Sequence, residues 1–367
     1  MVGATGMALR FTPSDASSPL SNGRLHMQRN DLPATSLPDY GRSDIFGIVI
    51  IGRNEGERLT RCLQSVKTFL QTIVYVDSGS TDNSVEMATA MGVDVVKLDM
   101  HIPFTAARAR NAGFQRLRSI SDRLRYIQFV DGDCEIIEGW LSTATDFLDL
   151  QPTIGVVCGR LRERHPERSI YNLMCDLEWN RPSGETDACG GIFMVRADLF
   201  ETLDGFRDDL VAGEEPELCR RVRNRGWKVW RLDQPMAWHD AAMLHFKQWW
   251  IRTRRTGFGY AQSAYLQRSL GERHRASQLL RPWAWAAILP MLIVGICAAF
   301  GPAGLFLLFI YPLQVLRTAR AISGSNRTRW ARAYFLTLGK FPELLGQLQF
   351  WARRRAANRA RTFDYKS

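Results

Sequence analysis

Short apolar runs alternate with segments of helical spacing through the first part of the chain. The apolar runs predict strands at 46–51, 73–76, 93–98 and 126–130. The segments between them predict helices at 58–70, 82–90 and 105–117, with Asp82 as the cap of the second. Strands that alternate with helices predict βαβ units and a largely parallel sheet. Ligands of such sheets bind beyond the carboxyl ends of the strands.

The alternation becomes less regular after position 150. The pattern there predicts strands at 154–159, 188–195 and 227–232, and helices at 216–224 and 243–266. Residues 1–44 are rich in Ser, Pro, Asn and Asp without sustained periodicity, so we expect a disordered extension. The α/β domain is therefore expected at 45–240, and an amphipathic helical segment at 241–282.

Residues 283–316 contain no charged side chain. As one helix they would extend roughly 51 Å, which exceeds the ~30 Å hydrocarbon core of a bilayer. Gly301-Pro302 interrupts the stretch near its middle, and arginines precede and follow it. We predict a helical hairpin with both ends on the cytoplasmic side. A buried helix pair and a shallow re-entrant element are the alternatives.

The charge is divided unevenly along the chain. Residues 1–240 carry 28 Lys and Arg against 34 Asp and Glu (−6), whereas residues 241–367 carry 20 against 3 (+17). The folded domain is thus acidic, which argues against nucleic acid as a partner. Basic residues beside an apolar stretch favour contact with membrane lipids. The tail 317–367 is basic and partly amphipathic, as an interfacial helix or a packing helix would be.

The seven cysteines are scattered, with no CxxC pair, which favours a reducing compartment over a disulfide framework or zinc site. No basic segment leads into an apolar one near Met1, so we expect no secretory signal. We therefore expect a protein of the cytoplasmic membrane, with the α/β domain facing the cytoplasm.

Acidic motifs follow the predicted strands in order. They are Asn54-Glu55, Asp77-Ser78, Asp131-Gly132-Asp133 and, later, Gly213-Glu214-Glu215. Asp131 and Asp133 offer hard oxygen ligands that suit Mg²⁺ or Mn²⁺. The set predicts a site for a metal ion, a nucleotide diphosphate and a general base.

The ordered motifs resemble one known family. IVIIGRNEGERLTRCLQSV, VDSGSTDNS, ARARNAG, FVDGD, ACGGIFMVRADLFETLDGF and GEEPELCRRVR are similar to segments of the family 2 inverting glycosyltransferases. The resemblance covers residues 46–240. It implies an α/β GT-A fold with a mostly parallel mixed sheet, here followed by the membrane hairpin.

The resemblance also implies roles on the donor side. Asp133 becomes the main metal ligand and Asp131 lies nearer the ribose. Glu55 and Asp77 contact the base and ribose of the nucleotide. Ser78 stands where many members have Asp, so uridine, guanosine and thymidine stay open as the base.

Further donor-side roles follow from the next motifs. Arg110, in the Arg110-Asn111 pair, braces the diphosphate. Gly190-Gly191 lets the backbone approach the donor sugar or acceptor, or forms a plain bulge.

Glu214-Glu215 occupies the place of the family's Glu-Asp pair, whose second carboxylate is the general base. That residue is Glu215 here, with Glu214 as the alternative. His239 is a candidate third metal ligand or a structural histidine.

The segment after 245 separates two kinds of transferase. Processive synthases carry QxxRW, but Gln248 is followed by Trp-Trp-Ile without Arg at the fourth place. One hairpin is also too little for a polysaccharide channel. Both points favour a single-addition enzyme. The arginines at 252, 254 and 255 then either guide a lipid-pyrophosphate acceptor or lie on a helix that docks on the bilayer.

The leading hypothesis is a metal-dependent inverting glycosyltransferase. It moves one sugar from a nucleotide-diphosphate sugar to a lipid-linked acceptor in polysaccharide or glycolipid biosynthesis. The alternative is a nucleotide-sugar-binding scaffold without turnover in a membrane assembly complex.

Overall fold

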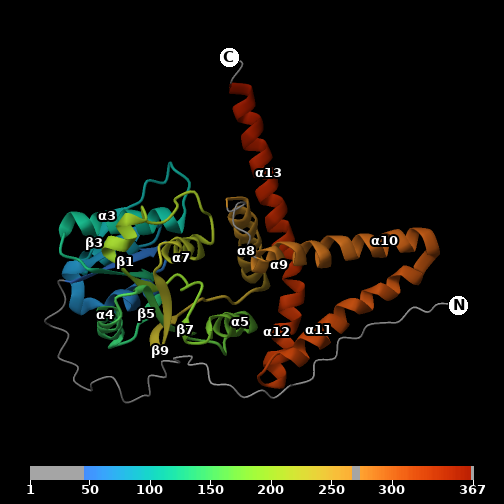
Figure 1. Ribbon diagram of the computed structural model, residues 1–367, viewed down its shortest axis with the longest axis horizontal. Coiled ribbons are helices and arrows are strands. Elements are labelled where there is room, and N and C mark those ends of the chain that lie inside the picture. Colours follow the sequence, from blue (N-terminus) through green and yellow to red (C-terminus); the bar gives the residue numbers. More distant parts are fainter. Residues whose placement is uncertain (1–44, 267–272, 365–367) are drawn as a thin grey trace, which may run out of the picture. The chain divides into compact units, whose positions relative to one another are not determined.

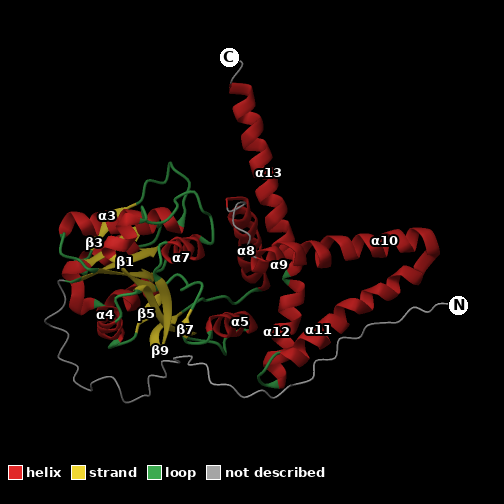
Figure 2. Ribbon diagram, viewed as in Figure 1, coloured by secondary structure: helices red, strands yellow, loops and turns green. Residues whose placement is uncertain are grey.

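A computed structural model describes residues 45–266 and 273–364 of the chain (Figure 1). The predicted extension 1–44 lies outside the described residues. The strands gather in one mixed sheet, with helices on its faces (Figure 2). Its order is β3-β2-β1-β4-β8-β6-β9-β5, with β7 paired to β9. The prediction of an α/β, mostly parallel mixed sheet is confirmed.

The first four predicted strands form the parallel part of the sheet. Their bounds are β1 (Phe46–Gly52), β2 (Ile73–Asp77), β3 (Asp94–Lys97) and β4 (Tyr126–Asp131). The strand β1 lies between β2 and β4, with Gly52 opposite Asp77 and Ile51 opposite Asp131. The order of connection therefore reverses at β1, where α/β sheets place ligands.

The remaining strands complete the sheet on the other side of β4. They are β5 (Cys134–Ile136), β6 (Ile154–Glu163), β7 (Gly184–Glu185), β8 (Phe193–Arg196) and β9 (Lys228–His239). The strand β8 is antiparallel to both β4 and β6, whereas β6 and β9 run parallel. The short β5 pairs with the end of β9, so Cys134 lies opposite His239. This pairing brings residues 133 and 239 together.

Helices cover the sheet in the first part of the chain. They are α1 (Glu57–Ser65), η2 (Lys67–Thr72), α2 (Ser84–Ala90), α3 (Ala106–Ile120), α4 (Trp140–Leu150), α5 (Ile170–Trp179), α6 (Ala197–Thr202) and α7 (Glu214–Asn224). The helix α3 lies very close to the sheet. An added Cβ at Gly113 would be 2.4 Å from Cγ1 of Val49, so this position requires glycine.

The core is built from side chains on both faces of the sheet. Ile48, Val74 and Phe129 are fully buried, as their apolar runs predict. Phe129 contacts the rings of Phe193 and Phe200 at centroid distances of 5.3 and 5.1 Å. These contacts join β4, β8 and α6 into one packed layer.

Several predicted boundaries are wrong for local reasons. The expected helix 58–70 breaks at Val66, because the chain turns there to place Phe69 against Phe46. The expected strand 188–195 begins only at Phe193, because Gly190 has a φ of +87°. Asn83, not Asp82, is the N-cap residue of α2, although Asp82 Oδ1 accepts the N–H of Ser84.

Helices make up the rest of the described chain. They are α8 (Phe246–Leu266), α9 (Arg273–Trp283), η3 (Ala284–Ile288), α10 (Leu289–Phe300), η4 (Gly301–Phe309), α11 (Ile310–Ala321), α12 (Asn326–Leu338) and α13 (Lys340–Asp364). The helices α8 and α13 cross closely. An added Cβ at Gly257 would lie 2.0 Å from the carbonyl oxygen of Glu343. Of the two readings of the tail, this contact favours a packing helix for α13.

One helical stretch among the described residues, Ser277–Ala321, is long and apolar enough to cross a membrane. Only 11% of its most apolar window is buried. The stretch turns at Gly301, whose φ is +73°, and η4 then packs against α10. A Cβ at Gly304 would be 2.6 Å from Sγ of Cys297, which shows how closely the two arms approach.

Candidate active site

Arg110 of α3 lies at the centre of the site and is 3% exposed. Its guanidinium donates to Oδ1 of Asp131 and to Oε1 of Glu214, each at 2.8 Å. The two carboxylates come from the end of β4 and the start of α7. Burial opposes the charge of Arg110, but the two carboxylates outweigh it and raise its pKa. The arginine is therefore a permanent cation that joins the DxD turn to the Glu-Glu motif.

Gly191 lies against this ion pair and leaves no room for a side chain. A Cβ there would be 2.8 Å from Oδ2 of Asp131 and 3.1 Å from Nη2 of Arg110. Its neighbour Gly190 has a positive φ, and the Gly190 N–H donates to Oε1 of Glu215 at 3.0 Å. The two glycines thus shape a loop that touches both acidic motifs.

Asp133 and His239 lie together on the paired strand ends. Their nearest atoms, Oδ2 and Nε2, are 3.5 Å apart, and Cys134 Sγ belongs to the same group of possible ligands. Burial disfavours the imidazolium, but Asp133, Glu163 and Asp131 outweigh this effect and raise the pKa of His239. A site that attracts positive charge, built from a carboxylate and an imidazole, fits Mn²⁺. Burial raises the pKa of the Cys134 thiol well above its usual range. Cys134 therefore stays protonated and does not offer a thiolate ligand.

Two partners support the imidazole of His239 from behind. Glu163 is 1% exposed, and its Oε2 lies 3.6 Å from Nδ1 of His239. This contact is an ion pair when His239 is protonated, and Nδ1 has no hydrogen-bond partner among the described residues. The ring of Trp179 lies 4.4 Å from the imidazole, centroid to centroid.

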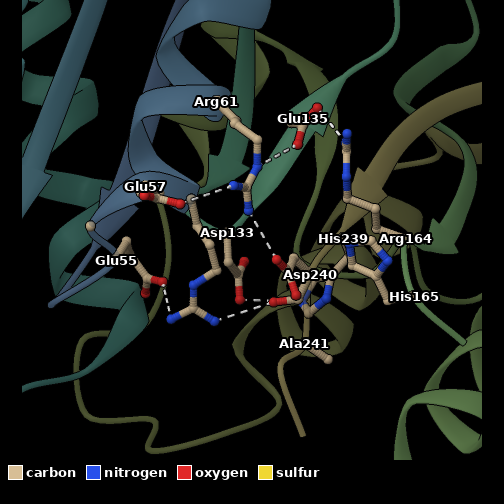
Figure 3. A network of polar contacts seen from close by, with 12 residues as sticks. Glu55, Glu57, Arg61, Asp133, Glu135, Arg164, His165, His239, Asp240 and Ala241 are labelled. Atoms are coloured by element: carbon tan, nitrogen blue, oxygen red, sulfur yellow. Dashed lines mark hydrogen bonds and ion pairs between the residues drawn. The ribbon is translucent and has the colours of Figure 1, made fainter. Parts of the chain in front are cut away.

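A second arginine ties together the segments that follow the two candidate ligands (Figure 3). Arg61 of α1 donates from Nε to Oε1 of Glu135 at 3.0 Å and from Nη2 to Oδ2 of Asp240 at 2.9 Å. Glu135 lies two residues after Asp133, and Asp240 directly follows His239. The backbone N–H of Asp240 also donates to the carbonyl oxygen of Asp133. Arg61 therefore helps to fix the spacing of the two ligands.

A cavity of about 550 Å³ extends over these groups at the carboxyl ends of β1 and β4. Eight predicted site residues line it: Glu55, Ser78, Arg110, Asp131, Asp133, Gly191, Glu214 and Glu215. Glu55 forms an ion pair with Arg58 at 2.7 Å, and its pKa is raised to about 7 by burial and by Asp133. The hydroxyl of Ser78 is buried and has no hydrogen-bond partner within the described residues.

Four predicted site residues do not line this cavity: Asp77, Asn111, Gly190 and His239. The carboxylate of Asp77 accepts from the N–H groups of Gly79 and Ser80 and from the Tyr75 hydroxyl, so it shapes the loop after β2. Asn111 exchanges hydrogen bonds with the backbone of Phe206. Both side chains support the site from outside its wall.

Glu215 lies at the boundary between two cavities. Besides the first, a cavity of about 720 Å³ is lined by Glu215, Gly190, Trp179 and residues of α8 such as Tyr260. Glu215, Gly191, Gly213 and Thr256 belong to both. Burial, followed by the charge of Glu214, raises the pKa of Glu215 to about 7. A carboxylate with this pKa can accept a proton near neutral pH.

Two arginines of α8 contribute to the site. Arg252 and Arg255 line the first cavity. Arg252 pairs with Glu178 at 2.8 Å, and Arg255 donates to the carbonyl oxygen of Val211. Trp249 packs on Phe335 of α12 at 4.9 Å. The helix α8 is thus a wall of the site.

Residues 47–203 match the family model for glycosyl transferase family 2. The matched segment contains Arg110, the DxD turn and the Gly190-Gly191 loop, which the fold brings together. These residues belong to glycosyl transferase family 2. The match supports the family that the motifs predict.

A curated relative matches the chain over part of its length. The chain is 26% identical over 238 residues to a TPR repeat-containing protein of Synechococcus elongatus. The match takes in 64% of this chain and 47% of that protein, so the chain spans about half the length of this relative.

The fold is shared with a solved structure at low sequence identity. The mannosyltransferase PcManGT from Pyrobaculum calidifontis, in complex with GDP-Man and Mn²⁺, aligns with a TM-score of 0.55 and 16% identity. The alignment covers 83% of this chain and 86% of that one. S. aureus TarS also aligns, with a TM-score of 0.45, 16% identity, and coverage of 82% of this chain and 55% of TarS.

Sequence reasoning missed the supporting residues of the site. Arg61, Glu163 and Trp179 contact candidate ligands or their neighbours, yet they lie in segments with ordinary helical or strand patterns. One signal was present: Glu135 and Asp240 are acidic residues close behind the predicted ligands Asp133 and His239. Buried acidic residues there require a cationic partner, which Arg61 provides.

Proposed function

We propose that the chain is a metal-dependent inverting glycosyltransferase. It transfers one sugar from a nucleotide-diphosphate sugar to a lipid-linked acceptor of polysaccharide or glycolipid assembly. The observation that carries the proposal is the position of Glu215 on the boundary of two cavities. One cavity contains the DxD turn and Arg110, and the other contains aromatic and cationic side chains.

The first cavity fits the donor. Arg110 is held between Asp131 and Glu214, so its charge is fixed close to where a diphosphate would lie. Arg252 and Arg255 add positive charge from the opposite wall. Glu55 and Ser78 line the end of the cavity at β1 and β2, where the nucleoside would be recognised.

Asp133 and His239 would hold the metal ion. When bound, such an ion supplies positive charge to a departing nucleotide diphosphate. Glu163 lies behind the imidazole, and Arg61 holds the two ligand-bearing segments in register. The solved complex of PcManGT contains GDP-Man and Mn²⁺. Its shared fold supports the same two ligand classes here, as an analogy.

Glu215 would be the general base. Its Oε1 accepts the Gly190 N–H, which leaves the carboxylate oriented toward the shared boundary. The raised pKa suits proton removal from an acceptor hydroxyl near neutral pH. The hydroxyl oxygen then attacks the anomeric carbon, and the nucleotide diphosphate departs from the opposite side.

The hairpin supplies the membrane location. Val294, Phe300 and Phe306 are 69%, 77% and 73% exposed, which is unusual for a large apolar group in water. Basic residues flank the stretch on both sides, so its ends belong on the cytoplasmic face. Gln278, the second residue of the membrane-competent stretch, also lines the second cavity. The acceptor would thus be met where the membrane begins.

The test is a thermal-shift panel with UDP-, GDP-, TDP- and CMP-sugars, each with and without Mn²⁺. We expect one nucleotide class to raise the melting temperature only when Mn²⁺ is present. The Asp133→Ala variant should lose this shift. A shift that persists in Asp133→Ala would contradict the metal site. Binding without transfer to any membrane extract would instead support a scaffold without turnover.

A further inference from the structure

The second cavity contains a buried arginine without an acidic partner. Arg231 of β9 is 6% exposed. It donates only to carbonyl oxygens, of Gly159 at 3.0 Å and of Ala188 and Cys189 at 3.4 and 3.5 Å. Its Nε has no hydrogen-bond partner among residues 45–266 and 273–364. A buried guanidinium whose charge no carboxylate balances is costly unless a ligand balances it.

A second cation of the same cavity also has no ion-pair partner among the described residues. Arg181 follows α5 and is exposed, and its guanidinium donates only to the carbonyl oxygen of Glu178. The other charges of the lining are matched: Arg223 pairs with Asp187, and the carboxylate of Glu178 pairs with Arg252. Within the described lining, Arg181 and Arg231 therefore face a cavity whose one unpaired carboxylate is the proposed base.

The cavity also lies next to the membrane-competent helix. Gln278 lines it, and the apolar window of the same helix follows within a few residues. Trp179 and Tyr260 add aromatic side chains to the lining. An occupant can thus place a hydroxyl at Glu215 while its remaining part extends toward the bilayer.

We propose that this cavity binds the phosphate or pyrophosphate group of a lipid-linked acceptor through Arg231 and Arg181. The inference rests on the proposed function, because it assigns the second cavity to the acceptor. Guanidinium groups form paired, charge-assisted hydrogen bonds with phosphate oxygens, and a phosphate would supply the missing acceptor for Arg231 Nε. The acceptor of this enzyme is therefore anionic, and its charge is read beside the reacting hydroxyl.

The experiment measures equilibrium binding of three probes to the full chain in detergent: farnesyl pyrophosphate, farnesol and inorganic pyrophosphate. EDTA and the Asp133→Ala background remove pyrophosphate binding at the metal site. We expect farnesyl pyrophosphate to bind at least about tenfold more tightly than farnesol, because charge-assisted hydrogen bonds form only with the former. Arg181→Glu, which alters an exposed side chain, should weaken it by about tenfold or more.

Further variants separate charge recognition from folding. Arg231→Met should weaken binding more than Arg231→Lys, which keeps the charge. Arg116→Gln, an exposed arginine paired with Asp94, should bind as the parent does. Equal binding of farnesol and farnesyl pyrophosphate, or unchanged binding in both Arg181→Glu and Arg231→Met, would overturn the proposal. Inorganic pyrophosphate that binds as tightly as farnesyl pyrophosphate would overturn the lipid assignment.

Donor binding is measured separately on chains that retain Asp133. Arg181→Glu should show the same Mn²⁺-dependent donor shift as the natural chain. If the natural chain does not bind any donor, the proposed function is contradicted. This outcome would leave the probe measurements intact, since those are made without metal or donor.

Discussion

The sheet and the hairpin both contain long apolar runs, but the sheet buries these side chains and the hairpin exposes them. Phe129 of β4 has no exposed surface, whereas Phe306 of η4 is 73% exposed. The sheet is covered by its own helices and so provides its own apolar surroundings. The hairpin arms bury little more than their mutual contact, near Gly304 and Cys297. The difference shows that hydrophobicity alone does not make a core, and it is the reason for proposing that the hairpin enters a membrane.

The strongest test of this comparison is to place charge on the hairpin. Val294→Arg together with Phe306→Arg should move the protein from the membrane to the soluble fraction. Each arginine costs roughly 2.5–3.5 kcal/mol at the centre of a membrane helix. Vesicle flotation measures the change.

A matched control lies on the α/β domain. Leu150, at the end of α4, is 61% exposed. Leu150→Arg should leave flotation unchanged, because this side chain belongs to the water-facing surface. Natural protein that fails to float with vesicles would remove the membrane interpretation of the hairpin.

The next test concerns the region that the sheet positions. Glu215→Gln should reduce transfer by about 10²–10⁴-fold, the usual contribution of a general base. Donor binding should stay within about twofold, because the neutral amide keeps the size of the side chain. Steady-state kinetics and the donor thermal shift give the two readouts.

The neighbouring carboxylate is the internal comparison. Glu214→Gln removes an ion pair with Arg110 and should mainly weaken donor binding. Glu201→Gln, on the exposed side of α6, should change neither quantity. A large loss of turnover in Glu214→Gln, with Glu215→Gln active, would transfer the role of the base to Glu214.

The sequence predicts the parallel half of the sheet well, because local patterns determine it. Strands 73–76 and 126–130 appear within one residue of their observed bounds, since buried parallel strands are short apolar runs between helices. The antiparallel half was harder. The short strand β5 has only three residues, and its pairing with β9 spans about a hundred positions. No local pattern reports such a contact.

The same contrast applies to the site. Asp131, Asp133 and Glu215 follow from motifs, and the fold gathers them around Arg110. Asp77 also belongs to a motif, but its carboxylate is used by the N–H groups of its own loop. Glu135 and Asp240 indicate that a cation is needed, but Arg61 could not be identified as that cation in advance, because the two acidic residues become neighbours only after β5 and β9 pair.

Arg61 provides a test of moderate size. Arg61→Met should weaken Mn²⁺ binding by about 10–100-fold, as is typical when an outer partner of a metal site is removed. The Mn²⁺ concentration at half-maximal thermal shift measures this effect without turnover. Excess Mn²⁺ should restore donor binding. Arg118→Met, which removes an arginine paired with Asp198 and Glu201 away from the cavity, is the control. An unchanged Mn²⁺ requirement in Arg61→Met would reduce Arg61 to a structural ion pair.

The smallest expected effect is the pH dependence of transfer. Burial and the adjacent charge of Glu214 raise the pKa of Glu215 to about 7, although Arg110 and Arg181 act in the opposite direction. A base is active only when deprotonated, so the rate at saturating Mn²⁺ and donor should rise with pH. For a pKa near 7 the active fraction increases about tenfold between pH 6 and pH 8. Arg181→Gln removes a charge that lowers this pKa, so it should move the acid limb of the profile to higher pH. A pH-independent rate across this range would mean that proton removal by Glu215 does not limit transfer. An acid limb that moves to lower pH in Arg181→Gln would mean that the charge of Arg181 does not lower the pKa of Glu215. It would then also contradict the placing of Arg181 and Glu215 in one acceptor cavity.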